Sequence, residues 1–393
     1  MENKIDITKD AIFYGGQSED ENTSVETSTE NNDKINNDKI DFIGQGSYSC
    51  VFRPAIKCNN TIDPNDPNDK FFVSKISKKD KYIENEFHIS SIIQQVPRYY
   101  HYFSPILENC DADLYELGST TAAFAEFKKC NLFIENGDII KKDNGSMTTV
   151  ESGSGNGSGN GSGSNAVEYI YNKIRYVGHK DLYSYLEEHE NEWKDAFTYL
   201  SYSISLLREK GIVHYDFKGN NVMVHDKHHT PIIIDFGLSI DINQTIRGDG
   251  GAVDTEDRLR RAFYVYSTDY EVWCPEIVFI CYFTQERKSA LSEPITIDDI
   301  DFVCNDFMKN NGIFGEQYFN MDEQKRENYR ASMHSFFSAF LNRSATETII
   351  EITETYYNTW DMYSLVVCFQ SACTIPLPDE YIKFISADPR ERL

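Results

Sequence analysis

The stretch G-I-V-H-Y-D-F-K-G-N-N-V-M-V occupies residues 211–224, and I-I-I-D-F-G-L follows at residues 232–238. Apolar residues flank the polar centre of the first stretch, which predicts two short strands joined by a loop. Four polar side chains lie in that loop: His214, Asp216, Lys218 and Asn221. Asp235 ends the next apolar run, and the interval after Asp216 has room for a β-hairpin. Such a hairpin would gather both carboxylates and the Asn221 amide around one point.

This set of groups is what phosphoryl transfer requires. One carboxylate orients the attacking hydroxyl and accepts its proton, a second carboxylate and an amide oxygen hold Mg²⁺, and an ammonium group neutralises the γ-phosphate. The alternative is a core hairpin with ordinary Asp–Gly turns, and a lone D-F-G would favour it. All the residues in this order, after a predicted amphipathic helix at residues 193–210, favour the chemical interpretation.

The two stretches resemble the catalytic loop H-R-D-L-K-x-x-N and the D-F-G motif of the protein kinases. The resemblance implies that Asp216 and Lys218 are catalytic, that Asn221 and Asp235 hold the metal, and that the cofactors are ATP and Mg²⁺. It also implies the fold class: an α+β, bilobed, protein-kinase-like fold with a small strand-rich N-lobe and a larger helical C-lobe.

Upstream, D-F-I-G-Q-G-S-Y-S-C-V-F at residues 41–52 resembles the glycine-rich loop of the same family. The resemblance assigns eight residues of this stretch to ATP: Ile43, Gly44, Gln45, Gly46, Ser47, Tyr48, Ser49 and Val51. Ser49 replaces the third glycine, and Val51 would pack on the adenine. F-V-S-K-I at residues 72–76 resembles the third strand, with Lys75 on the α- and β-phosphates. Taken singly, a G-x-G is more often an ordinary turn and a strand lysine a solvated edge residue.

Lys75 needs a glutamate from the helix that follows. Ile89, Ile92, Ile93 and Val96 form the apolar face of that helix. At about 100° per residue, Glu86 lies about 70° from the centre of this face and Glu84 about 130°. We therefore expect Glu86 to pair with Lys75, and Glu84 is the alternative.

I-R-Y-V-G-H-K-D-L at residues 174–182 resembles the hinge between kinase lobes. Ile174 would be the gatekeeper, backbone groups of Arg175 and Val177 would bind the adenine edge, and Asp181 would bind the ribose. A surface turn before a helix is the alternative for this motif.

Three later motifs extend the resemblance to the end of the chain. W-C-P-E at residues 273–276 resembles A-P-E, and W-D-M-Y-S-L at residues 360–365 resembles a helix start whose Asp361 bonds backbone near the catalytic loop. D-P-R-E-R at residues 388–392 would let Arg392 pair with Glu276. The chain departs from the family at Tyr215, which replaces the arginine that clamps an activation-loop phosphate.

The domain organisation follows from these motifs and from composition. We expect a disordered acidic tail at residues 1–38, an N-lobe at 39–178 with a flexible Gly/Ser/Asn insertion at 152–165, and a C-lobe at 179–393. A helical insertion is expected at residues 277–358, with Asn320 as an N-cap and Glu323 as its partner. Its apolar stripe comprises Tyr329, Met333, Phe336, Phe337, Phe340 and Leu341.

The formal net charge of −25 argues against binding to a nucleic-acid backbone or an anionic membrane. It favours a basic protein as substrate. No run of about 18 apolar residues is present, so no membrane span is expected. Nine cysteines without a C-x-x-C pair predict reduced thiols in a cytoplasmic protein.

The leading interpretation is a serine/threonine protein kinase, because Lys218 follows Asp216 as it does in that class. The asparagine-rich repeats, the catalytic loop without arginine and W-C-P-E are most like kinases of large DNA viruses of protists, which would place the protein in the host cytoplasm or the virion. A pseudokinase scaffold that keeps the fold without turnover is one alternative. A small-molecule kinase of the aminoglycoside or choline type is another, although such enzymes seldom combine D-F-G with a P-E motif.

Overall fold

The computed structural model describes residues 40–46, 49–56, 71–112, 125–131, 141–143, 146–148, 168–248, 254–316, 318–373 and 377–393. The predicted tail, the Gly/Ser/Asn insertion, Ser47 and Tyr48 lie outside these residues. The chain is α+β, as expected from the sequence. Among the described residues, no helix has both the length and the apolar character needed to cross a membrane.

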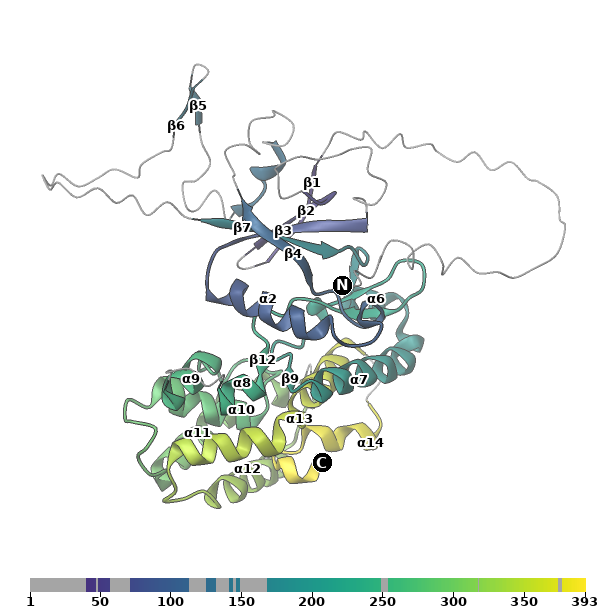
Figure 1. The fold of residues 1–393 in the computed structure, drawn as a ribbon. Coiled ribbons are helices and arrows are strands. Elements are labelled where there is room, and N and C mark those ends of the chain that lie inside the picture. Colours follow the sequence, from purple (N-terminus) through teal and green to yellow (C-terminus); the bar gives the residue numbers. More distant parts are fainter. Residues whose placement is uncertain are drawn as a thin grey trace, which may run out of the picture. The chain divides into compact units, whose positions relative to one another are not determined.

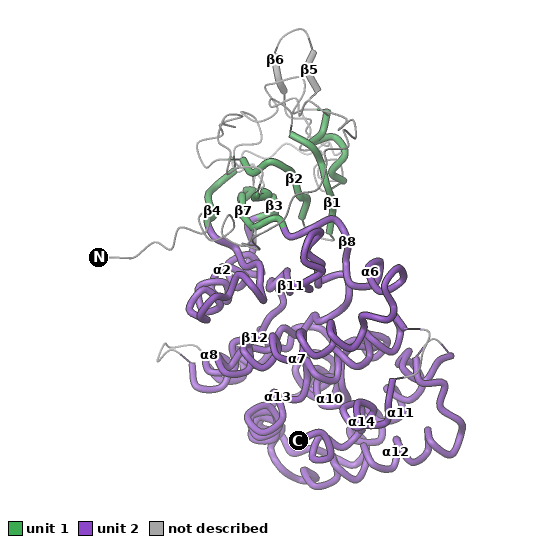
Figure 2. Tube along the Cα trace, turned by 90° about the vertical axis from the view of Figure 1, so that its right-hand side faces the viewer, with its two compact units in different colours: residues 1–78, 108–176 green, residues 79–107, 177–393 purple. Residues whose placement is uncertain are grey.

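The chain divides into two compact units (Figure 2). The first comprises Met1–Lys78 and Glu108–Tyr176, and the second comprises Lys79–Leu107 and Val177–Leu393. The sequence prediction assigned all of residues 39–178 to one lobe. The structure instead groups helix α2 (Lys81–Ile93) with the second unit, because its polar side chains bond to backbone and side-chain groups there.

The first unit is built on a five-stranded sheet in the order β1-β2-β3-β7-β4 (Figure 1). Its strands are β1 (Asp41–Gln45), β2 (Ser49–Arg53), β3 (Phe72–Lys78), β7 (Tyr169–Arg175) and β4 (Ile106–Ala112). The pairs β1–β2, β2–β3 and β3–β7 are antiparallel. A separate hairpin joins β5 (Lys141–Asp143) to β6 (Ser146–Thr148).

The two faces of this sheet differ in chemistry. Side chains alternate along a strand and directly paired residues share a face, so the register assigns each residue to a side. One face buries an apolar cluster that includes Cys50, Phe52, Ile76, Tyr169 and Tyr171. The register pairs Val51 with Lys75 and Lys75 with Asn172, which forms one row across β2, β3 and β7 on the opposite face.

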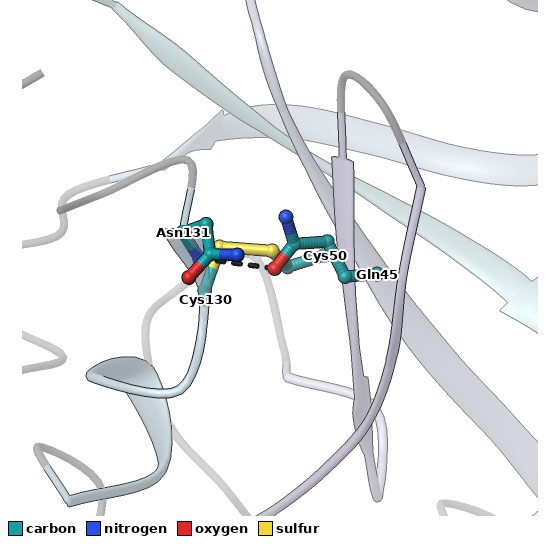
Figure 3. The surroundings of a disulfide bond; sticks show 4 residues. All are labelled: Gln45, Cys50, Cys130 and Asn131. Carbon is teal, nitrogen blue, oxygen red and sulfur yellow. Dashed lines mark hydrogen bonds between the residues drawn. A yellow bond between two sulfur atoms is a disulfide. The ribbon is translucent and has the colours of Figure 1, made fainter. Parts of the chain in front are cut away.

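The cysteine prediction was wrong for the first unit. Cys50 and Cys130 form a disulfide with their Cα atoms 6.0 Å apart (Figure 3), and Cys110 is also disulfide-bonded. Beside this bond the Asn131 N–H donates to Gln45 Oε1 at 3.0 Å. The bridge joins residues 80 apart in sequence on the apolar face of the sheet, so spacing alone carried no signal for it. Five buried cysteines are free: Cys274, Cys281, Cys304, Cys368 and Cys373.

Replacing Cys50 and Cys130 together by alanine is expected to lower the free energy of unfolding of the sheet by about 2–5 kcal/mol, because the cross-link restricts the unfolded chain. Hydrogen exchange of the β2 and β3 amides measures this loss. Peptide mapping under non-reducing conditions should recover the two cysteines in one linked peptide pair. A free Cys50 thiol in the native protein would contradict the assignment.

The second unit is mainly helical and contains two small sheets. The larger sheet has the order β11-β10-β8 and the smaller pairs β12 with β9. The strands are β8 (Lys180–Asp181), β9 (Ile212–Val213), β10 (Val222–Val224), β11 (Pro231–Ile233) and β12 (Ile240–Asp241). The helices after α2 are α6 (Leu182–Glu188), α7 (Trp193–Glu209), α8 (Ile242–Arg247), α9 (Thr255–Ala262), α10 (Pro275–Cys281), α11 (Ile297–Asn310), α12 (Glu323–Ser338), α13 (Ala345–Ala372) and α14 (Asp379–Ile382).

Helix α7 forms where its apolar periodicity predicts it. Phe197, Leu200, Ile204 and Leu207 are all buried along one face. Gly211 follows the helix with φ of +72°, the left-handed conformation that glycine adopts at no steric cost after a helix end. The helix therefore stops just before β9 and the catalytic-loop motif.

The region 277–358 contains helices, but two of its details differ from the prediction. Helix α12 begins after Asp322, whose carboxylate accepts from the Lys325 N–H at 2.8 Å. Asn320 is not the cap, because its backbone lies in the left-handed region with φ of +39°. The predicted stripe is buried from Tyr329 to Phe340, whereas Leu341 is 36% exposed.

Helix α13 runs without a break through W-D-M-Y-S-L, so no helix starts at that motif. Asp361 lies in the interior of this 28-residue helix and is 4% exposed. The expected partnership of Arg392 with Glu276 is confirmed: the two side chains form a fully buried ion pair. This pair ties the end of the chain to the start of α10.

Candidate active site

The backbone of the catalytic-loop motif is fixed by one buried carboxylate. Asp361 Oδ2 accepts from the His214 N–H at 2.7 Å, and Oδ1 accepts from the Tyr215 N–H at 3.1 Å. Burial raises the pKa of Asp361 above its usual value, while these bonds and the nearby His214 act in the opposite direction. The contact that the sequence predicted for Asp361 is present, although it comes from mid-helix.

Two residues at the site have left-handed backbone conformations. Tyr215 has φ of +68° and Asp235 has φ of +62°, both uncommon for residues other than glycine. Tyr215 is 1% exposed, and its carbonyl accepts from Trp273 Nε1 at 2.7 Å. Strained backbone persists only where its surroundings impose it, and such residues cluster at functional sites. Tyr215 immediately precedes Asp216, and Asp235 is itself one of the predicted metal ligands.

Asp216 lies at the centre of a polar cluster. Lys218 Nζ is 3.1 Å from each of its carboxylate oxygens, so the ammonium group bridges both. Asn221 Nδ2 donates to the Asp216 carbonyl at 2.9 Å and to its Oδ2 at 2.8 Å. The Tyr270 hydroxyl donates to Oδ1. The sequence predicted the first two neighbours of Asp216 and missed the third.

A hairpin brings Asn221 beside the D-F-G motif. Strands β10 and β11 pair in the register Val222 with Ile233, and the Ile234 N–H donates to the Asn221 carbonyl at 2.9 Å. This register confirms the expected hairpin and sets Asn221 next to the residue before Asp235. Because the Asn221 amide nitrogen is used on Asp216, the amide oxygen is the atom that remains for a cation.

Aromatic side chains pack against the phenylalanine of the D-F-G motif. Phe236 is fully buried, with its ring centroid 5.2 Å from that of His214 and 6.2 Å from that of Phe103. His214 Nε2 donates to the Ile234 carbonyl at 3.0 Å, since a carbonyl can only accept. The histidine therefore links the two motifs, and it has a structural rather than a chemical role.

Helix α2 contacts the same turn through its polar side. Asn85 Nδ2 donates to the carbonyls of Gly237 at 3.2 Å and Ser239 at 2.8 Å. Glu86 is 2% exposed, and a Cβ placed on Gly237 would lie 3.6 Å from Glu86 Oε2 and 3.7 Å from Asp235 Oδ1. Glu84 is exposed. Of the two candidate glutamates, Glu86 is the one that lies near the D-F-G turn.

Close packing does not explain why glycine occupies positions 44 and 46, where the sequence predicted phosphate binding. Among the described residues, a Cβ added to Gly44 would meet no atom within 4 Å, and one on Gly46 would meet only Ser49 Oγ, at 3.5 Å. By contrast, a Cβ on Gly219 would lie 2.6 Å from the Tyr183 ring. The register shifts between Phe42 and Gly44, which leaves Ile43 as a bulge.

The row on the second face of the sheet carries the predicted lysine. Lys75 is 8% exposed and is flanked by Val51 on β2 and Asn172 on β7. Ile174 pairs with Val73 and therefore lies on this face as well. Asn172 is fully buried, and its amide atoms have no hydrogen-bond partner in the part of the chain that the structure describes. Sequence analysis missed Asn172, because nothing in Y-I-Y-N-K-I marks it.

The predicted hinge residues fall on both sides of the unit boundary. Arg175 ends β7 in the first unit, and Val177 is buried in the second. Asp181 caps α6: its Oδ1 accepts from the Ser184 N–H at 2.8 Å, and its Oδ2 accepts from Asn220 Nδ2 at 2.6 Å. The capping role was not predicted, and it fixes the carboxylate beside the catalytic loop.

Tyr270 is the residue at Asp216 that sequence analysis did not find. Burial, together with the nearby Asp216 charge, raises the pKa of Tyr270, so its hydroxyl stays protonated and donates. Its ring lies 5.2 Å from that of Trp273 and 5.8 Å from Lys218 Nζ. The only sequence signal was an aromatic residue close before W-C-P-E.

Comparison with protein-family models and with curated proteins finds no match for this chain.

Replacing Asp361 by asparagine is expected to lower the free energy of unfolding by about 1–3 kcal/mol, because a side-chain amide has one acceptor oxygen for two buried N–H groups. Urea denaturation followed by tryptophan fluorescence measures the loss. Glu354→Gln, an exposed change on the same helix, is the matched control. Equal stability of the Asp361 variant and the control would show that this carboxylate does not fix the loop.

Proposed function

We propose that the chain is an ATP-dependent serine/threonine protein kinase with a bilobed, protein-kinase-like fold. The observation that carries the proposal is the cluster at Asp216. One carboxylate is bridged by a lysine and an asparagine amide, and the same asparagine is held by the β10–β11 hairpin next to Asp235. The chemistry of phosphoryl transfer needs a base, an ammonium group and oxygen ligands for a cation.

The donor set fits Mg²⁺ and the phosphates of ATP. Magnesium prefers oxygen ligands, and the Asn221 amide oxygen and the Asp235 carboxylate supply them. The Gly46 N–H donates to the Ser49 carbonyl at 2.9 Å, so we propose that the phosphates approach the hairpin at Gly44, where no Cβ stands in their way. When bound, Mg²⁺ would neutralise phosphate charge and orient the γ-phosphate for attack.

Each site residue of the second unit then has its own role in the reaction. Asp216 accepts a hydrogen bond from the acceptor hydroxyl and takes its proton. Lys218, already 3.1 Å from that carboxylate, places positive charge where the transferred group carries negative charge. Asn221 orients Asp216 through its amide nitrogen and holds the cation through its oxygen, together with Asp235.

The first unit would bind the nucleotide. We propose that Lys75 contacts the α- and β-phosphates and pairs with Glu86, and that Val51 contacts the adenine. Arg175 and Val177 would bind the adenine edge through their backbones, and Asp181 would bind the ribose. Asn172 adds a donor and an acceptor to the face that carries Lys75, and a buried amide without a partner requires one.

The acceptor would be a serine or threonine hydroxyl in a basic protein, since the chain carries a net charge of −25. We place the protein in the cytoplasm, or in the host cytoplasm or virion if it is viral. A pseudokinase scaffold is the second candidate, and the Tyr270 hydroxyl on Asp216 favours it, because that bond occupies the base.

Transfer of radiolabel from γ-labelled ATP with Mg²⁺ to a basic acceptor protein tests the proposal. Asp216→Asn and Asp235→Asn should each reduce the rate at least about 100-fold, because one removes the base and the other a metal ligand. Asp226→Asn in the β10–β11 turn, where the side chain is 45% exposed, is the matched control and should keep the rate. Absence of transfer by the wild type, with ATP still bound, would establish the pseudokinase instead.

Replacing Tyr270 by phenylalanine is expected to lower KM for the acceptor protein several-fold and to leave KM for ATP unchanged. An acceptor hydroxyl must replace the Tyr270 hydroxyl at Asp216 Oδ1, and the variant removes that competitor. Tyr202→Phe, at a 53% exposed position on α7, is the control. A fall in kcat with unchanged KM would show that Tyr270 positions Asp216 rather than competing with the substrate.

A further inference from the structure

A second group of polar side chains in the second unit stands apart from the residues assigned to phosphoryl transfer. His189, Glu192 and His229 each bring one possible metal-ligand atom to within 4.8 Å of the other two. His189 follows the end of α6, and Glu192 ends the short 3₁₀ turn Glu190–Glu192. His229 comes from the turn between β10 and β11. Among the described residues, this is the group of three or more His, Cys, Asp and Glu side chains whose ligand atoms lie this close together.

The ring of His189 is oriented as a ligand would be. Its Nδ1 is 3.2 Å from the Tyr185 carbonyl, which can only accept, so Nδ1 carries the proton and Nε2 keeps its lone pair. The ring also stacks on Tyr185, with centroids 4.6 Å apart and an interplanar angle of 13°. A histidine that donates one ring N–H to a backbone carbonyl and presents the other nitrogen is the usual arrangement in metal sites.

Glu192 and His229 already have a spacing close to that of two ligands on one ion. Glu192 Oε2 and His229 Nδ1 are 3.6 Å apart. Ligand bonds of about 2.0–2.1 Å in a tetrahedral zinc site place neighbouring ligand atoms about 3.4 Å apart. The Tyr185 hydroxyl donates to Glu192 Oε2, so in its 3.2 Å contact with His229 the Nδ1 group is the donor. A metal ion bound at Nδ1 would replace that proton.

The backbone at His229 is held in an unusual conformation. Its φ is +53°, in the left-handed region, and its N–H donates to the His225 carbonyl at 2.9 Å. The His225 N–H donates to the Thr230 carbonyl at 2.9 Å, and this bond closes the same turn. Strained backbone is found most often at functional sites, and here it sets the His229 ring beside His189 and Glu192.

We propose that His189, Glu192 and His229 form a zinc site that joins the β10–β11 turn to the end of α6. The ligand atoms are two imidazole nitrogens and one carboxylate oxygen, a set that suits Zn²⁺, with water as the fourth ligand. Tyr185 orients the carboxylate as an outer hydrogen-bond partner. This inference does not depend on the proposed kinase activity, because it concerns binding and stability of the chain alone.

Titration of the metal-free full-length chain with Zn²⁺ against a chromophoric chelator tests the proposal. The wild type should bind one tight equivalent, and Zn²⁺ should raise its thermal midpoint, because a ligand that binds the folded state stabilises it. His189→Ala and the conservative Glu192→Gln should each weaken binding at least about tenfold and abolish that shift.

His228→Ala is the matched control. It lies in the same turn, where its ring centroid is 4.9 Å from that of His225, and it is outside the proposed ligand set. The control should bind Zn²⁺ as the wild type does. For every variant the thermal midpoint is compared with and without Zn²⁺, because His189→Ala also loses the ring that stacks on Tyr185. Absence of tight binding, or binding that survives in His189→Ala, would overturn the site. So would a loss in His228→Ala equal to that in His189→Ala, or sulfur ligands in X-ray absorption at the zinc edge.

Discussion

The geometry of the candidate site depends on one buried carboxylate. Asp361, in the interior of α13, accepts hydrogen bonds from two consecutive backbone N–H groups, those of His214 and Tyr215. A buried N–H pair without an acceptor would be costly, so these bonds fix the strand exit and the left-handed turn at Tyr215. Asp216 directly follows this turn, and its carboxylate lies 3.1 Å from Lys218 Nζ. The long helix therefore fixes the backbone of a loop that lies far away in sequence.

The local elements of the second unit were largely predictable, because they follow from short-range patterns. Apolar periodicity predicted α7, and the spacing from Asp216 to Asp235 predicted the hairpin that β10 and β11 form. The burial of Glu86 against the exposure of Glu84 also agrees with a simple helical-wheel argument. In each case neighbours in sequence decide the outcome.

The features that the sequence did not predict have a different physical origin. The disulfide of Cys50 with Cys130 and the bond of Tyr270 to Asp216 join residues far apart in sequence, and no spacing rule identifies such pairs. Asn320 was a plausible cap by residue type, but its left-handed backbone moved the helix start to Asp322. Contacts made only by the tertiary fold remain outside what the pattern of one sequence can show.

The central claim is that Asn221 and Asp235 hold a cation on the phosphates of a nucleotide. A crystal structure of the chain with Mn²⁺ and a non-hydrolysable ATP analogue, phased with the manganese anomalous signal, tests it most directly. The account predicts an anomalous peak within bonding distance of the Asn221 amide oxygen and an Asp235 carboxylate oxygen, on the β- and γ-phosphate side of the analogue. A well-ordered nucleotide bound elsewhere, or bound here with no manganese at these two residues, would contradict it.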